Sequence, residues 1–242
     1  MISYSTISEK GGRPVNEDSF SVAKRGESFC FTLCDGLGGH GSGDIASKGV
    51  AKLFKAVFEQ SKLNGKKFFD FAYSKSNEAV IEYQEKKGNT YGTKTTVVSL
   101  IVDSETCMWS HLGDSRLYCF KKDSDYLRTL DHSVPQMLVR SKEISETEIR
   151  FHPDRNKILR AIGVDDEKPN YQLSECIKTN ECSAFLLCSD GFWELIDEIH
   201  MISLLKASNS PDEWLKKMSE IVLSNGKGKN MDNYTAIAVF VG

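Results

Sequence analysis

Short apolar runs that are joined to an aspartate constrain the fold and function of this chain more than any other feature of its sequence. Runs of this length, rich in Val, Ile, Phe and Thr, indicate β-strands. The junctions are Asp35-Gly36, Asp114-Ser115, Asp190-Gly191 and, in reversed order before the last run, Asp232-Asn233. Carboxylates that meet at one edge of a sheet form an oxygen-rich pocket, which suits hard divalent cations. The pattern therefore favours metal-assisted hydrolysis.

Strands and helices follow one another in blocks along the chain. The segments that we expect to be strands are 2–8, 18–23, 29–34, 94–102, 107–112, 116–121, 183–188 and 235–241. Apolar side chains at helical spacing predict helices over 44–61 and 67–87. A capping box with proline at the first helical position, 210–213, starts a third helix that ends near 226, and a box at 145–148 indicates a shorter one. This order predicts an α+β fold with helices outside antiparallel sheets.

Length, charge and cysteine content narrow the class of protein. A chain of 242 residues can bury the core of a single domain, so we expect one domain over 1–242. Its 31 basic and 34 acidic residues give a net charge of −3, which excludes nucleic acid or an anionic membrane as an expected partner. No apolar stretch approaches the ~18 residues of a membrane span, and the first 13 residues lack the apolar core of a signal peptide. The seven cysteines contain no Cys-x-x-Cys, so we expect buried, reduced thiols in a cytoplasmic protein.

The segment 13–18, with the sequence RPVNED, combines a cation with two acids. A charged surface turn would have the same composition. In the functional interpretation, the planar guanidinium of Arg13 binds two phosphate oxygens at once. Glu17 and Asp18 then supply contacts to a metal or to its water.

The glycine-rich segment 35–41, DGLGGHG, allows two interpretations. Glycine lets the backbone approach an ion, so the carbonyl of Gly36 is a candidate ligand. The same glycines match the fingerprint of dinucleotide-binding proteins, which would make the chain a nicotinamide-dependent oxidoreductase. That fold needs a second strand ending in an acid about 20 residues further on. The corresponding region is the predicted helix 44–61, so the context disfavours this alternative.

Taken together, the motifs resemble those of the metal-dependent protein serine/threonine phosphatases of type 2C, in particular their bacterial-type members. They follow the family's order and span essentially the whole chain. The motifs are Arg13-x-x-Asn16-Glu17-Asp18, Asp35-Gly36, Gly92-Thr93, Gly113-Asp114-Ser115-Arg116, Asp131-His132-Ser133, Arg160-Ala161-Ile162-Gly163, Ser189-Asp190-Gly191 and Asp232-Asn233-x-Thr235. The resemblance implies a central antiparallel β-sandwich flanked by helix pairs on both faces.

The resemblance also implies a binuclear centre of Mn²⁺ or Mg²⁺, with a weaker third ion in bacterial-type members. Asp35 would bridge the two metals. The other implied metal ligands are Asp190 and Asp232 on the first metal, Glu17 and the carbonyl of Gly36 on the second, and Asp114 with Asp190 on the third. Arg13 would bind the phosphate. The residues that would lie behind the ligands or contact the substrate are Asp18, Asn233 and Thr93.

The implied chemistry is hydrolysis of phosphoserine and phosphothreonine in one in-line step by a metal-activated water. Without cations, the clustered acids should raise one another's pKa values. Many eukaryotic members carry a histidine two places after the bridging aspartate, where this chain has Leu37, and His40 is near but not at that position. The proton donor for the leaving group therefore stays open, and His111 and His132 are expected to be structural.

We expect phosphorylated proteins as substrates, a partner serine/threonine kinase, and a monomer. The charged segment 133–165 is expected to be irregular and would suit a mobile flap beside the site. The main alternative is a catalytically weak, phosphoprotein-binding pseudophosphatase. Such proteins lack one or more metal acids, whereas this chain has the complete set.

Overall fold

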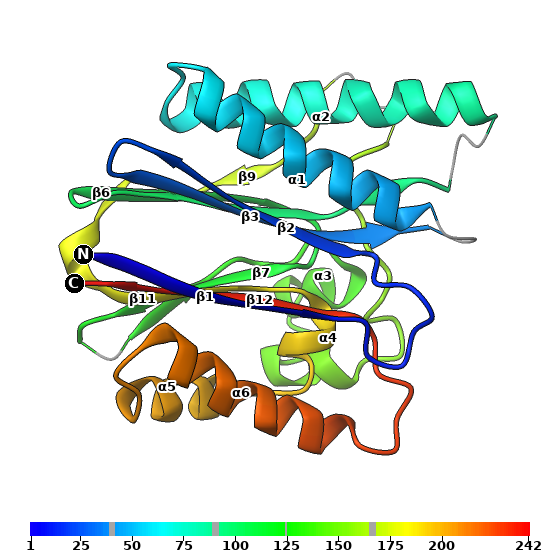
Figure 1. The fold of residues 1–242 in the computed structure, drawn as a ribbon. Coiled ribbons are helices and arrows are strands. Elements are labelled where there is room, and N and C mark those ends of the chain that lie inside the picture. Colours follow the sequence, from blue (N-terminus) through cyan, green and yellow to red (C-terminus); the bar gives the residue numbers. More distant parts are fainter. Residues whose placement is uncertain (39–41, 89–91, 124, 165–167) are drawn as a thin grey trace.

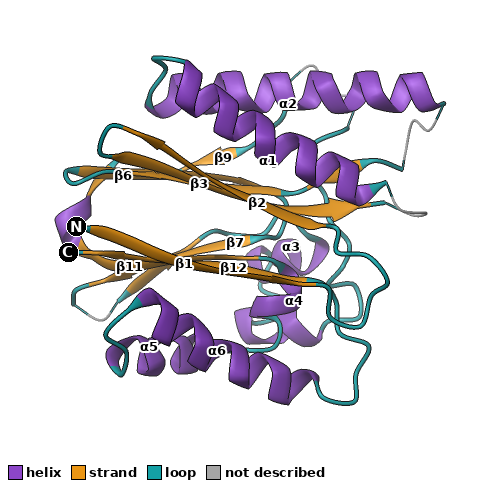
Figure 2. Ribbon diagram, in the orientation of Figure 1, coloured by secondary structure: helices purple, strands orange, loops and turns teal. Residues whose placement is uncertain are grey.

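The computed structural model describes residues 1–38, 42–88, 92–123, 125–164 and 168–242. Two antiparallel sheets lie face to face, and helices cover the outer face of each (Figure 1). Figure 2 shows the same four layers by element type, with α1 and α2 over one sheet and α5 and α6 over the other. This arrangement confirms the predicted α+β sandwich with helices on both faces.

The first sheet has the strand order β1-β12-β11-β7-β8. Its strands are β1 (Ile2–Glu9), β12 (Tyr234–Val241), β11 (Cys182–Cys188), β7 (Arg116–Lys121) and β8 (Tyr126–Arg128). All neighbours pair antiparallel, and Arg116 of β7 lies opposite Cys188 of β11. The start of β7 and the end of β11 therefore meet at one end of the sheet.

The second sheet has the order β10-β6-β5-β3-β2, with β4 paired to β3 and β9 paired to β6. Its strands are β2 (Asp18–Arg25), β3 (Ser28–Leu37), β4 (Lys94–Thr95), β5 (Val97–Val102), β6 (Thr106–Leu112), β9 (Gln172–Leu173) and β10 (Ile177–Lys178). The strand expected over 94–102 is interrupted at Thr96. There, the backbone N–H of Thr96 donates to the carbonyl of Asp35 and its hydroxyl accepts from the N–H of Asp35, which draws the chain toward the end of β3.

The helices bury the stripes that the sequence predicts. α1 (Gly43–Gln60) and α2 (Gly65–Lys87) pack on the second sheet, and α6 (Pro211–Gly226) packs on the first. At the start of α6, the hydroxyl of Ser210 accepts from the N–H of Glu213, as the capping box predicts. The remaining helices are α3 (Val134–Arg140), α4 (Asp190–Trp193), α5 (Glu198–Lys206) and the short 3₁₀ helices η1 (Glu146–Phe151) and η2 (Thr179–Glu181).

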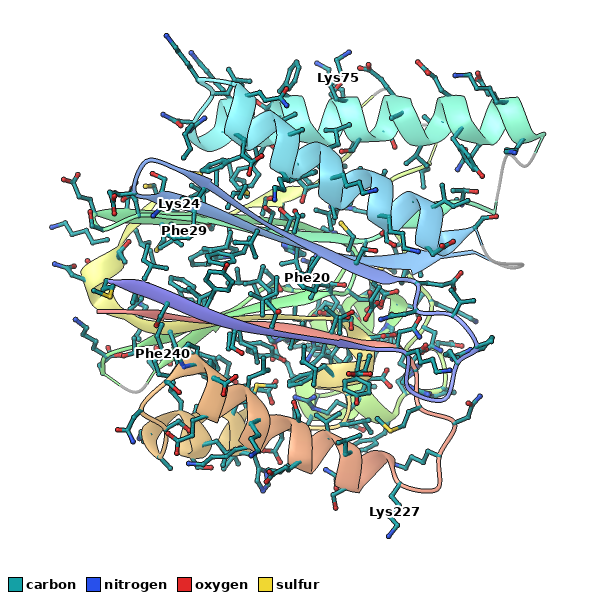
Figure 3. The ribbon with its side chains drawn as sticks, in the orientation of Figure 1. Phe20, Lys24, Phe29, Lys75, Lys227 and Phe240 are labelled. Atoms are coloured by element: carbon teal, nitrogen blue, oxygen red, sulfur yellow. The ribbon has the colours of Figure 1, made fainter. Side chains whose placement is uncertain are left out.

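The core between the sheets is built from alternate side chains of both. Phe31, Leu33, Phe185 and Ile237 are fully buried there, each contributing about 1.5–3 kcal/mol by burial. Figure 3 shows side chains filling the space between the two sheets. This packing fixes the ends of the strands, and the site depends on those ends.

Within the segment 133–165, the described residues 133–164 are more ordered than their composition indicates. The prediction of an irregular segment was wrong, because α3 and η1 lie within it and Ile149 is buried in the core of the first sheet. The predicted cap at 145–148 is present, since the N–H of Ser145 donates to the carboxylate of Glu148. Among the described residues, no helix combines the length and the apolar character needed to cross a membrane.

One end of the sandwich collects the loops that carry the candidate residues. The loop after β1, the turn into α4 and the segment before β12 gather at the end opposite the two termini (Figure 1). The strand ends that sequence analysis singled out therefore meet at this end.

Candidate metal centre

A pocket of about 490 Å³ opens at this end of the sandwich. It holds every candidate site residue except Asp18 and Thr93. The lining residues are Arg13, Pro14, Val15, Glu17, Asp35, Gly36, Leu37, Gly38, Asp114, Asn156, Ile158, Asp190, Asp232 and Asn233. The fold thus brings the carboxylates of five segments, far apart in the sequence, to one cavity.

Asn233 holds the loop that carries Arg13 and Glu17. Its amide nitrogen donates to the carbonyls of Lys10 and Val15, both at 2.9 Å. Its amide oxygen accepts from the backbone N–H of Glu17 at 2.8 Å. One nearly buried side chain therefore fixes the loop at three points, which accounts for an asparagine directly after Asp232.

A close backbone approach sets the position of Gly36. A Cβ atom on Gly36 would lie 2.3 Å from the carbonyl oxygen of Gly43, so only glycine fits. The N–H of Gly36 donates to the carbonyl of Glu17 at 3.1 Å, and the hydroxyl of Ser47 donates to the same carbonyl. The first turn of α1 therefore locks the two segments that supply Glu17 and Gly36.

Asp18 and Asp35 face each other across paired strands. They are directly opposite in the register of β2 and β3, and like charges in that position destabilise a sheet. Burial, followed by the charge of Asp18, raises the pKa of Asp35 well above its usual value. Burial raises the pKa of Asp18 to about 6, although the hydroxyl of Ser189 donates to its carboxylate at 2.7 Å. The other carboxylate oxygen of Asp18 is buried and has no hydrogen-bond partner among the described residues.

Asp114 and Asp190 lie next to the ends of two paired strands of the first sheet, β7 and β11. Asp114 lies between β6 and β7, and burial raises its pKa to about 7, with the charge of Asp131 as the next cause. Its Oδ1 is likewise buried without a partner in the described part of the chain. Asp190 begins α4, where burial and then the charge of Asp114 raise its pKa well above the usual value. Asp18, Asp35, Asp114 and Asp190 therefore lack, within the described part of the chain, an ion-pair partner that would favour their ionised form.

Asp232 differs from the other acids because it has a cationic neighbour. Nη2 of Arg13 lies 2.8 Å from Oδ2 of Asp232 at the exposed rim of the pocket. Across the described ranges, no three His, Cys, Asp or Glu side chains are arranged as a closed metal-binding cluster. The two unpartnered oxygens and the all-oxygen donor set are what fit hard divalent cations here.

Comparison with known proteins decides the family. The model of the family described as protein phosphatase 2C matches residues 9–231 of this chain. The chain belongs to the protein phosphatase 2C family. Membership makes it a phosphoprotein phosphatase by class, which confirms the resemblance found in the motifs, and it rules out the oxidoreductase alternative. In agreement, α1 leads into the helix α2 rather than into a second strand.

Individual relatives agree with the family assignment. The serine/threonine phosphatase stp of Listeria innocua is 29% identical over 230 residues, covering 93% of this chain and 89% of that protein. The crystal structure of serine/threonine phosphatase Stp1 from Staphylococcus aureus matches with a TM-score of 0.90 and 26% identity, covering 100% and 96% of the chains. The catalytic domain of serine threonine protein phosphatase PstP, in complex with two manganese ions, matches with a TM-score of 0.79 and 25% identity over 100% and 99%.

Some predicted residues of this phosphatase lie away from the pocket. Thr93 is buried against the groove between α1 and α2, where its carbonyl accepts from the amide of Gln84 at 2.6 Å.

Leu37 lines the pocket at the position where many eukaryotic members have histidine, and His40 lies outside the described residues. His111 and His132 stack on each other at 4.6 Å and bond the backbone at Leu130 and Gly113, as expected for structural histidines.

Sequence reasoning missed the charged network behind Asp114. Arg116, within the Gly-Asp-Ser-Arg motif, forms a bidentate ion pair with Asp131 at 2.9 and 2.6 Å. Its guanidinium lies 3.4 Å from the ring centre of Trp193. The indole N–H of Trp193 in turn donates to the carbonyl of Asp114 at 3.1 Å. The signal in the sequence was the arginine of the motif that also carries Asp114, together with the aspartate of the motif Asp131-His132-Ser133.

Proposed function

We propose that this chain is a metal-dependent protein serine/threonine phosphatase that hydrolyses phosphoserine and phosphothreonine in proteins. One observation carries the proposal: the pocket collects five carboxylates, of which only Asp232 has an ion-pair partner among the described residues, and that partner is Arg13 at the rim. In the family, such acids hold two divalent cations. The PstP catalytic domain, which matches this fold, contains two manganese ions.

The residues present fit Mn²⁺ or Mg²⁺. Asp35, Asp190 and Asp232 would hold the first ion, and Asp35 with Glu17 and the carbonyl of Gly36 would hold the second. A weaker third ion would take Asp114 together with Asp190. When bound, the cations supply positive charge to the phosphate and activate water for attack on phosphorus.

The chain's own groups orient the substrate. Arg13 is half-exposed at the mouth of the pocket, so its planar guanidinium can turn from Asp232 to two phosphate oxygens. Asn233 keeps Arg13 and Glu17 in register through the backbone of their loop. Ser189, which directly precedes Asp190, donates to Asp18, which lies opposite Asp35, so we assign both to the support of these two acids. The contacts of the folded chain support each of these roles.

The wider setting forms part of the same proposal. Residues 1–242 act as one catalytic domain, a monomer in the cytoplasm, on proteins phosphorylated by a partner serine/threonine kinase. Asn156 and Ile158 bring the segment 133–165 to the pocket wall, where it serves as the flap that contacts the phosphoprotein.

The direct test is hydrolysis of phosphoserine and phosphothreonine peptides by the purified chain. We expect phosphate release with Mn²⁺ or Mg²⁺ and none in excess EDTA. Asp70→Asn is a matched control, because Asp70 is a half-exposed acid on α2 that pairs with Lys66. Binding of a phosphopeptide without hydrolysis at any cation concentration would favour the pseudophosphatase instead.

A further inference from the structure

Three thiols that the proposed function does not use meet inside the sandwich. Cys107 in β6, Cys119 in β7 and Cys182 at the start of β11 are each at most 1% exposed. The sulfur of Cys182 lies 3.4 Å from that of Cys119 and 4.0 Å from that of Cys107. All three are free thiols. Cys182 is thus the shared neighbour in a cluster that draws on both sheets.

The contacts make the three thiols unequal. In the contacts of Cys182 with Cys107 and Cys119, either sulfur can be the donor. Cys182 is the member of the cluster that can accept from both neighbours, and accepting lowers its pKa against the raising effect of burial. The same contacts raise the pKa values of Cys107 and Cys119. Because the thiolate is the nucleophile in thiol oxidation, Cys182 is the member of the cluster that reacts first.

A surface cavity lies next to the turn that precedes Cys182. Cys182 directly follows η2, a single turn of three residues. Thr179 and Asn180 of that turn, with Lys122, line a surface cavity of about 270 Å³. That volume holds several water-sized molecules. Local opening of so short a turn would expose the buried sulfurs without unfolding the sheets.

We propose that Cys119 and Cys182 form a redox-active pair that a peroxide oxidises to an intramolecular disulfide. The thiolate of Cys182 attacks one oxygen of hydrogen peroxide, which gives a sulfenic acid and releases hydroxide. The thiol of Cys119 then attacks that sulfur; the S–S bond forms, and the sulfenic oxygen leaves as water with the remaining proton. Overall, two thiols and one peroxide yield one disulfide and two waters. Cys119 is the partner because its sulfur is closer than that of Cys107.

The bond would join the two strands that lead to the site. β7 begins just after Asp114, and β11 ends just before Asp190, whereas Cys182 lies at the opposite end of β11. The disulfide would therefore link β7 to β11 covalently near the end of the sheet that lies away from the pocket. Its formation is independent of metal binding and of catalysis, so failure of the proposed function would not affect it.

Mapping the thiols of the intact chain tests the proposal. The folded protein is treated with hydrogen peroxide, alkylated, digested without reduction and analysed by mass spectrometry. We expect a linked peptide containing Cys119 and Cys182 that dithiothreitol separates. Cys119→Ala should lose this peptide, while Cys107→Ala and the buried control Cys188→Ala should keep it. The midpoint of thermal unfolding should rise on oxidation of the wild type but not of Cys119→Ala.

Two results would overturn the pair, and both are available from the wild-type protein alone. In the first, Cys119 and Cys182 stay alkylatable while only Cys176, which is exposed, has been oxidised. In the second, the oxidised protein carries the same mixture of linkages whether it was treated folded or in guanidinium chloride. An equal rise of the unfolding midpoint in Cys119→Ala would also contradict the assignment.

Discussion

Two groups of buried or partly buried carboxylates are neighbours in this molecule. The fold pairs the first group with guanidinium groups and leaves most of the second group without such partners among the described residues. In the network behind the pocket, Asp131 has the guanidinium of Arg116 within 2.6 Å, and Arg150 lies 2.6 Å from Glu198. Burial raises the pKa of Glu198, but Arg150, a backbone hydrogen bond and the charge of Arg116 together outweigh it, and the pKa falls below its usual value. In the pocket, burial and like charges instead raise the pKa values of Asp35, Asp114 and Asp190.

The difference separates structural acids from functional ones. A buried carboxylate with its own guanidinium stabilises the folded state only as long as both partners are present. A buried carboxylate without one destabilises the fold until an external cation binds. Trp193 joins the two groups, since its ring lies on Arg116 and its N–H bonds Asp114. The paired group therefore holds the unpaired group in place.

The largest effect should follow from neutralising the acid that is proposed to bridge both metals. Asp35→Asn should lower phosphatase activity by on the order of 10³-fold, because each ion would lose an anionic ligand. In the same variant, the metal-free protein should become more stable, because asparagine removes the free-energy cost of burying a carboxyl group, ionised or protonated, among other acids. Phosphopeptide turnover and urea unfolding in EDTA measure the two effects, and Asp70→Asn should change neither by much. A metal-free Asp35→Asn protein that is less stable than wild type would break the comparison.

Removing an acid of the paired group should act on stability first. Asp131→Ala leaves the guanidinium of Arg116, which is 2% exposed, without its main partner. Loss of one member of a buried ion pair costs roughly 3–5 kcal/mol of unfolding free energy. Urea unfolding in EDTA measures this cost. A loss of unfolding free energy below about 1 kcal/mol would show that the ion pair with Asp131 does not stabilise buried Arg116.

Asn233 should matter for activity more than for folding. Asn233→Ala removes three hydrogen bonds that fix the loop of Arg13 and Glu17. Residues that orient ligands typically cost 10–100-fold, so we expect a decrease of that order in kcat/KM. Asn225→Ala, which removes a single bond to the carbonyl of Leu195, is the control. Equal losses of kcat/KM in the two variants would show that Asn233 has no specific role in the site.

The smallest expected effect is the pH dependence of the unfolding free energy of the metal-free protein. Carboxyl groups with raised pKa values keep their protons in the folded state above the pH at which the unfolded chain loses them. The free energy of unfolding of the metal-free protein should therefore fall as pH rises to the raised pKa values, and the pKa of Asp114 is about 7. The pKa values of Asp35 and Asp190 are raised in the same direction. We expect a fall on the order of 1–2 kcal/mol between about pH 6.5 and about pH 7.5.

The pH range avoids an opposing effect. Burial lowers the pKa values of His111 and His132, so these side chains add stability as pH rises, but only up to about the ordinary histidine value of 6.5. Thermal or urea unfolding with EDTA and with Mn²⁺ gives the contrast. The gain from Mn²⁺ should increase with pH, and a gain that shrinks would contradict the account.

Much of the fold follows from local patterns in the sequence. The strand over 116–121 has the predicted bounds, and α1, α2 and α6 lie within two residues of the predicted starts, because long amphipathic stripes and caps are local signals. α5 was missed, although Asp197 caps it by accepting from the N–H of His200. The apolar residues of α5 do not form a clear stripe at helical spacing, so the periodicity gave no signal. The interruption at Thr96 was also missed, because it depends on a bond to Asp35 from another strand.

The site was predictable as a set of acids but not as a geometry. Acids at strand ends were visible in the chain, and the pocket gathers them. Thr93 lies away from the pocket, because its place in a sequence motif does not show where its side chain lies in the fold. The roles of Asn233 and Arg116 depend on contacts with residues 15 to more than 200 positions away, which no local pattern encodes.

Calorimetric titration with Mn²⁺ tests the central claim most directly. The claim is that the pocket's carboxylates are left unpaired for divalent cations. We predict that the wild-type chain and Asp70→Asn bind about two Mn²⁺ per molecule, and that Asp35→Asn loses both binding events or weakens them by more than tenfold. Equal Mn²⁺ binding by wild type and Asp35→Asn, or no binding by a folded wild-type protein, would contradict the account.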